Sequence, residues 1–140
     1  VDGVTNTTLY TNNEDGTELA VEYENDVEIG RTVTTYTDDK TTRVTTGRGA
    51  GTSETVWGEH GIVSESYNYT DPDYMSYTVK YVYDDAGFEW KVTTTYANGD
   101  TQTTVYNRDQ SFNVTSEVTT SNYGYSCTVT YEYMQITVRG

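Results

Sequence analysis

The sequence has very few of the residues that usually fix a chemical function. It contains one cysteine (Cys127), one histidine (His60) and one proline (Pro72). A single cysteine excludes an intramolecular disulfide, and a zinc site needs several His or Cys ligands. No Ser-His-Asp or Cys-His group can be assembled around the one histidine. We therefore expect a protein that is not an enzyme and holds no cofactor.

Basic residues are also scarce, with eight Lys and Arg against 22 Asp and Glu and a formal net charge of −14. Binding to phosphates needs Lys and Arg arranged on a surface, so we expect no nucleic-acid partner, and an anionic membrane surface is disfavoured for the same reason. No apolar run approaches the length of a membrane-spanning helix, so we expect no membrane span. The charge is typical of a solvated surface, and it can also attract divalent cations.

Thr, Tyr and Val are abundant, whereas Leu, Ile and Met are scarce. This composition favours pleated, half-buried surfaces. Apolar and polar residues alternate in segments such as 77–83 and 88–96, which is the period of a β-strand. Turn signals recur at intervals of roughly ten to fifteen residues, so we predict one all-β domain over residues 1–140, an antiparallel β-sandwich or meander of about 8 to 10 short strands.

Three local features lead to narrower expectations. The Asn98-Gly99 pair predicts a type I′ hairpin turn, because both central residues of that turn need positive φ. Residues 31–49 predict a Thr-rich hairpin that projects or packs on something outside the domain, since little of it is apolar. The segment 47–54 is predicted to be a mobile loop because small residues leave its backbone unconstrained.

The last part of the chain alternates in an unusual way. Cys127 shares one face with Tyr125 and Val129, which predicts a small core residue, with an intermolecular disulfide as the alternative. The apolar face then switches at Met134, so the sequence predicts either a β-bulge at this point or a strand that pairs with a neighbouring molecule. In the second case the predicted assembly residues are Met134, Ile136 and Val138, together with Leu9 near the other end of the chain.

The sequence contains 15 Tyr and two Trp, more aromatic side chains than a core of this size needs. Tyrosine combines a flat apolar ring with a polar tip, as sugar-binding faces and protein interfaces require, although it can also fill a core. Aromatic residues near predicted loops are the candidates for stacking against a glycan: Trp57, Tyr67, Tyr69 and Tyr74.

Asparagine and aspartate supply two further hypotheses. Asn-x-Ser/Thr triplets begin at Asn6, Asn68 and Asn113 and are possible glycosylation sites. Segments 12–18 and 69–74 gather the oxygen ligands that Ca²⁺ prefers, without matching the twelve-residue calcium loop. They fit either a structural calcium site or plain turns, in which Asp and Asn are common.

These observations favour a non-enzymatic extracellular structural subunit that associates with identical subunits into a fibre or surface filament by terminal strand addition. The composition is similar to that of surface adhesins and extracellular fibre subunits. The alternative is a carbohydrate-binding or adhesin module, and a glycan-processing enzyme comes third. The chain begins with Val1 rather than Met, as expected of a mature protein without its leader or of a trimmed chain, and we expect an extracellular or cell-surface location.

Overall fold

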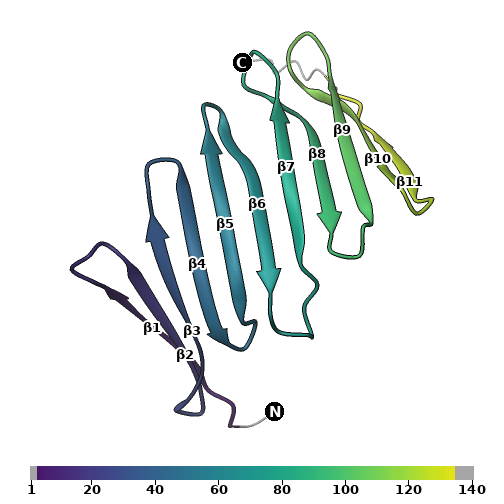
Figure 1. Cartoon of the computed structure of the whole chain (residues 1–140). Coiled ribbons are helices and arrows are strands. Elements are labelled where there is room, and N and C mark those ends of the chain that lie inside the picture. The colour runs from purple at the N-terminus through teal and green to yellow at the C-terminus, as the bar shows by residue number, and fades with distance from the viewer. Residues whose placement is uncertain (1–2, 135–140) are drawn as a thin grey trace, which may run out of the picture.

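Eleven β-strands follow one another along the chain and form one open antiparallel sheet in the computed structural model, which describes residues 3–134 (Figure 1). Each strand pairs with its neighbours in the sequence, so the order across the sheet is the order along the chain. The strands are β1 (Asn6–Asn12), β2 (Glu18–Glu24), β3 (Val27–Tyr36), β4 (Lys40–Gly47), β5 (Gly51–Gly58), β6 (Gly61–Tyr69), β7 (Tyr77–Tyr83), β8 (Glu89–Tyr96), β9 (Thr101–Arg108), β10 (Val114–Ser121) and β11 (Ser126–Thr130).

The predicted all-β, antiparallel meander is confirmed, with slightly more strands than expected. The predicted sandwich is not confirmed, because residues 3–134 contain no second sheet packed on the first. The alternation of apolar and polar residues identifies strands that have one apolar face. It does not say what covers that face.

Very little of the molecule is buried. Its accessible surface is 10042 Å², whereas a compact monomer of this mass exposes about 7,300 Å². Among the described residues Val21 is the only buried apolar side chain, and the other buried residues are Gly30 and three threonines, Thr34, Thr41 and Thr55. Hydrogen bonds and side-chain pairs between neighbouring strands therefore hold the sheet together in place of a core.

Five hairpins share one five-residue turn, in which the first residue donates its N–H to the carbonyl of the fifth. The fourth residue has positive φ, as in a type I turn followed by a bulge. The five fourth residues are Gly16, Gly87, Gly99, Phe112 and Gly124. The predicted type I′ turn at Asn98-Gly99 is wrong because Gly99 alone has positive φ there; the turn with two such residues lies at Asn25-Asp26.

Three other local predictions are also wrong. The Thr-rich hairpin, now β3 and β4, lies inside the sheet between β2 and β5 instead of projecting from it. Most of segment 47–54 is paired, since Gly47 ends β4 and Gly51 begins β5. Cys127 is exposed and not part of a core, because β11 is the last strand of the sheet and no other layer within residues 3–134 packs on it.

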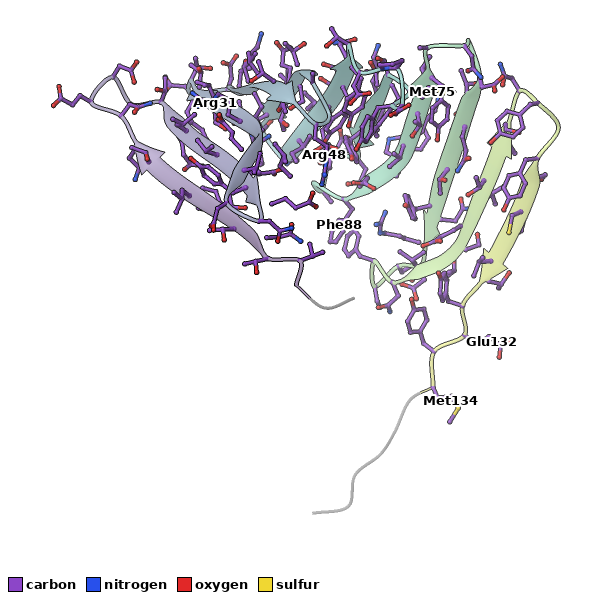
Figure 2. All side chains as sticks on the ribbon, turned by 90° about the horizontal axis from the view of Figure 1, so that it is seen from below. Arg31, Arg48, Met75, Phe88, Glu132 and Met134 are labelled. Carbon is purple, nitrogen blue, oxygen red and sulfur yellow. The ribbon has the colours of Figure 1, made fainter. Side chains whose placement is uncertain are left out.

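The two faces of the sheet differ in composition. Residues directly opposite each other in paired strands share a face, and nine strand tyrosines share the face that we call the tyrosine face: Tyr10, Tyr36, Tyr67, Tyr69, Tyr77, Tyr81, Tyr83, Tyr96 and Tyr106. The other face carries rows of hydroxyls such as Thr93, Thr103 and Thr120. Figure 2 shows the sheet as an arch with Arg48 on its inner side, and Arg48 pairs at 3.7 Å with Glu24, so the tyrosine face is the inner one.

Candidate functional site

Both edges of the sheet are open. Every residue of β1 and of β11 is exposed, and in residues 3–134 each of these strands pairs on one side only. Natural sheets usually protect such edges with charged side chains, proline or a bulge. Neither β1 (NTTLYTN) nor β11 (SCTVT) contains a charged residue or a proline. The two edges therefore lack the usual barriers to pairing with another strand.

The direction of each backbone group at these edges follows from the turns. Asn13 donates to the Thr17 carbonyl and Asn25 to the Thr5 carbonyl, so the odd-numbered residues of β1 face β2. The N–H and carbonyl groups of the even-numbered residues, including Thr8 and Tyr10, then point away from the sheet. By the same alternation Ser126, Thr128 and Thr130 carry the outward groups of β11, because Tyr131 donates to the Thr115 carbonyl.

The predicted assembly residues are only partly described. Leu9 lies in β1, with 55% of its surface exposed. Met134 lies beyond the end of β11 and is 85% exposed, so no bulge is found at this position within a strand. Ile136 and Val138 lie outside the described residues, and their part in assembly stays a prediction.

A row of neighbouring tyrosine rings, most of them stacked, crosses the inner face. Tyr67, Tyr77 and Tyr96 lie directly opposite one another in β6, β7 and β8. Their ring centroids are 4.8 Å apart between Tyr67 and Tyr77 and 6.1 Å apart between Tyr77 and Tyr96. Tyr69 continues the row beside Tyr67 at 6.3 Å, and Tyr74 from the following loop stacks on Tyr69 at 5.1 Å.

The Tyr74 end of this row borders a hollow of about 280 Å³ on the same face. Its lining residues are Glu22, Thr32, Thr45, Gly49, Gly51, Thr52, Ser53, Tyr67, Tyr69 and Tyr74. Two loops at its rim are tied together, because Gly49 donates its N–H to the Asp71 carboxylate at 3.1 Å and Thr70 donates to the Ala50 carbonyl at 2.9 Å. The hollow is therefore held open by fixed backbone.

Two tyrosine hydroxyls of this row, those of Tyr67 and Tyr77, stay protonated at neutral pH. Partial burial raises the pKa of Tyr67, and the nearby Glu65 carboxylate raises it further. Burial is also the main cause of the raised pKa of Tyr77, with neighbouring tyrosines adding to it. Each hydroxyl can thus both donate and accept a hydrogen bond.

The structure brings three of the four predicted glycan-stacking residues together. Tyr67, Tyr69 and Tyr74 line the hollow. Trp57 is exposed but lies six residues from Gly51 along β5, which is about 20 Å in a strand. Sequence reasoning missed Tyr77 and Tyr96 as members of the row, although the β7–β8 hairpin would have paired them.

The three asparagines predicted to carry sugar lie at exposed positions in different parts of the sheet. Asn6 begins β1, Asn68 is in β6, and Asn113 is the last residue of the turn between β9 and β10. The side chain of Asn113 donates to Asp109 at 3.3 Å. Glycosylation at these positions stays a prediction.

The segments predicted to bind calcium form turns. The Asp15 carboxylate accepts hydrogen bonds from the Thr17 backbone and hydroxyl, and these bonds lower its pKa. Asp71 accepts from Gly49 and Asp73 in a similar way. Within residues 3–134 no group of three or more His, Cys, Asp or Glu side chains is arranged to hold a metal ion. Structural calcium stays an untested hypothesis.

No protein-family model matches the sequence, and no curated protein matches it significantly. The described part of the chain has no helix that is long and apolar enough to cross a membrane. Function must therefore be inferred from the open edges and from the tyrosine face.

Proposed function

We propose that this protein is a non-enzymatic extracellular structural subunit that associates with identical copies at its open sheet edges and forms a filament. The observation that carries the proposal is the pair of exposed edge strands without charge or proline, on a sheet with almost no core. The bias of the composition toward Thr, Ser, Asn, Gly and Tyr supports the extracellular location.

Pairing at the edges would supply stability that the isolated sheet lacks. Each added strand satisfies a row of backbone groups and brings new side-chain pairs, each of which contributes roughly 0.2–1 kcal/mol. Leu9 and Tyr10 on β1, and Val129 on β11, would then lose exposed apolar surface.

The strand count determines what kind of joint can form. In an antiparallel meander of eleven strands, β1 and β11 run in the same direction. Adding a copy by translation therefore places β11 of one copy parallel to β1 of the next, and this contact leaves a free edge at each end. Such a head-to-tail contact propagates into a filament. A two-fold contact of β11 with β11 would instead be antiparallel and would stop at the dimer.

The test replaces the residue at the centre of each outward-facing row with proline. Thr8→Pro and Thr128→Pro each remove an outward N–H without removing a bond to the neighbouring strand. Thr8→Val and Thr128→Val are the matched controls, because they keep the N–H. All variants are compared with the full chain by sedimentation velocity over a wide concentration range and by electron microscopy.

We expect the wild type and both valine variants to form filaments and each proline variant alone to stay monomeric. An equimolar mixture of the two proline variants should form dimers only, since it contains one intact β1 edge and one intact β11 edge. Dimers of Thr8→Pro by itself would show the two-fold contact and overturn the filament. A wild type that is monomeric at every concentration, or proline variants that assemble unchanged, would overturn self-association.

A further inference from the structure

The hollow beside the tyrosine row has one aromatic wall and one polar wall. Tyr67, Tyr69 and Tyr74 form the aromatic wall, and hydroxyls of Thr32 and Thr45 lie on the opposite side. Flat apolar surfaces next to hydrogen-bonding groups match a sugar ring, which has C–H bonds on its faces and hydroxyls at its edge. We propose that this hollow binds an uncharged oligosaccharide.

The aromatic wall is fixed before a ligand arrives. Tyr69 is stacked between Tyr67, at 6.3 Å, and Tyr74, at 5.1 Å. The Tyr69 amide donates to the Ser76 hydroxyl at 2.8 Å, which ties the strand to the loop that carries Tyr74. Tyr74 ends the row and is 45% exposed. It is therefore the ring whose surface is open to a sugar, and little conformational entropy is lost on binding.

The polar wall can exchange hydrogen bonds with sugar hydroxyls. The Thr32 and Thr45 hydroxyls lie 2.9 Å apart and bond to each other. Since a hydroxyl has one donor and two acceptor sites, each keeps some capacity for a ligand. The Glu22 carboxylate lies at the same hollow and offers acceptors to donor hydroxyls. Gly51 lines the hollow as well, and a side chain there would collide with the backbone of β6 at Asn68 and Tyr69.

Charge and strand pairing narrow the ligand class. A chain of net charge −14 with Glu22 in the hollow repels uronic acids and sulfated sugars. An extended peptide usually binds a sheet by adding a strand at an edge. The strands around the hollow, β2 to β6, are paired on both sides, so no edge is available there. An uncharged glycan needs neither a positive patch nor a free edge.

The size of the site sets the expected affinity. A volume of about 280 Å³ lies near the lower limit of ligand sites, which hold about 300–1,000 Å³. The hollow has room for one or two sugar rings, and the exposed tyrosine row gives the rest of an oligosaccharide a surface to follow. We expect binding in the millimolar range with fast exchange.

The test is a ¹⁵N–¹H NMR titration of the full chain with cellotetraose, chitotetraose and maltotetraose. Polygalacturonate and a proline-rich peptide are the comparison ligands. Tyr74→Ala removes the open ring, and Thr45→Val removes a hydroxyl while keeping the shape of the side chain. The control is Tyr123→Ala, which removes a similarly exposed tyrosine from the β10–β11 turn, away from the hollow.

We expect at least one neutral tetrasaccharide to shift amides that line the hollow, with saturation in the millimolar range. Thr45→Val should weaken this binding about fivefold, the usual effect of one lost hydrogen bond, and Tyr74→Ala should weaken it further, while Tyr123→Ala should have no effect. If Tyr74→Ala fails to fold, the binding measured for Thr45→Val alone tests the proposal. Absence of shifts with all three sugars, shifts that map elsewhere, or tighter binding of polygalacturonate or the peptide would overturn the proposal. Self-association is not needed for this result, because the titration can be repeated on Thr8→Pro.

Discussion

Phe112 stacks on Phe88 with ring centroids 4.7 Å apart and planes inclined by 10°, although its backbone has φ of 64°. The equivalent residue in the four related hairpins is glycine. Left-handed backbone costs a side-chain-bearing residue roughly 1–2 kcal/mol. Phe88 and Arg108 offset this cost: the Arg108 guanidinium lies 5.4 Å from the Phe88 ring centre. The stack ties the turn between β7 and β8 to the turn between β9 and β10.

Two substitutions separate the backbone cost from the stacking. Phe112→Ala and Phe112→Gly both remove the ring, but only the alanine keeps a Cβ in the left-handed region. We expect Phe112→Gly to have the higher free energy of unfolding, by about 1 kcal/mol, measured by urea denaturation. Equal stability, or a more stable Phe112→Ala, would contradict a left-handed conformation at this position.

The comparison of these turns shows what sequence reasoning could and could not predict. A positive φ can be predicted at Gly87 and Gly99, because each glycine lies in a sequence typical of a turn. A positive φ at Phe112 cannot be predicted in this way, because the stabilising contact comes from Phe88 on another hairpin. The same limit applies at Asn25-Asp26, where both residues have positive φ without any glycine, and where the tolerance of Asn and Asp for this region was the only available signal.

The hydroxyl of Tyr81 makes the stability of the fold depend on pH. Burial raises its pKa, and the hydrogen bond to the Glu65 carboxylate, at 2.8 Å, raises it further. A tyrosine whose pKa is higher in the folded than in the unfolded state binds its proton more tightly when folded. Its contribution to stability is complete below about pH 10, the pKa of an unfolded tyrosine, and is lost as pH rises toward the folded value.

We therefore expect the urea midpoint to stay level from about pH 8 to 9.5 and to fall above about pH 10. Tyr81→Phe should make that fall less steep, because the replaced group no longer titrates. Glu65→Gln should act in the same direction, since it removes the charge that opposes ionisation. A Tyr81→Phe variant whose alkaline slope matches that of the wild type would show that this hydroxyl does not control the transition.

The fold class was predictable because it rests on local patterns. Alternation in segments such as 77–83 and turns every ten to fifteen residues specify a meander without any long-range information. The candidate site was only partly predictable. Tyr67 and Tyr69 are neighbours on one strand, but Glu22 reaches the same hollow through the pairing of β2 to β6. The exposure of Cys127 was not predictable, because alternation is the same whether or not a second layer covers the strand.

The open edges predict a pattern of amide exchange on β1 that reports both the fold and its assembly. In the isolated sheet the amides of Thr7, Leu9 and Thr11 donate to β2, and those of Thr8 and Tyr10 face solvent. Hydrogen exchange measured by NMR at low concentration should therefore be slow and fast at alternate residues. The alternation follows from hydrogen bonding alone, because every residue of β1 is exposed. At concentrations where filaments form, the Thr8 and Tyr10 amides should become as protected as their neighbours. In Thr128→Pro, which cannot offer its β11 edge, these two amides should continue to exchange fast.

Uniformly fast exchange along β1 at low concentration would mean that this strand is not paired with β2. If slow and fast amide exchange still alternate along β1 in the filaments, the filaments assemble through another surface.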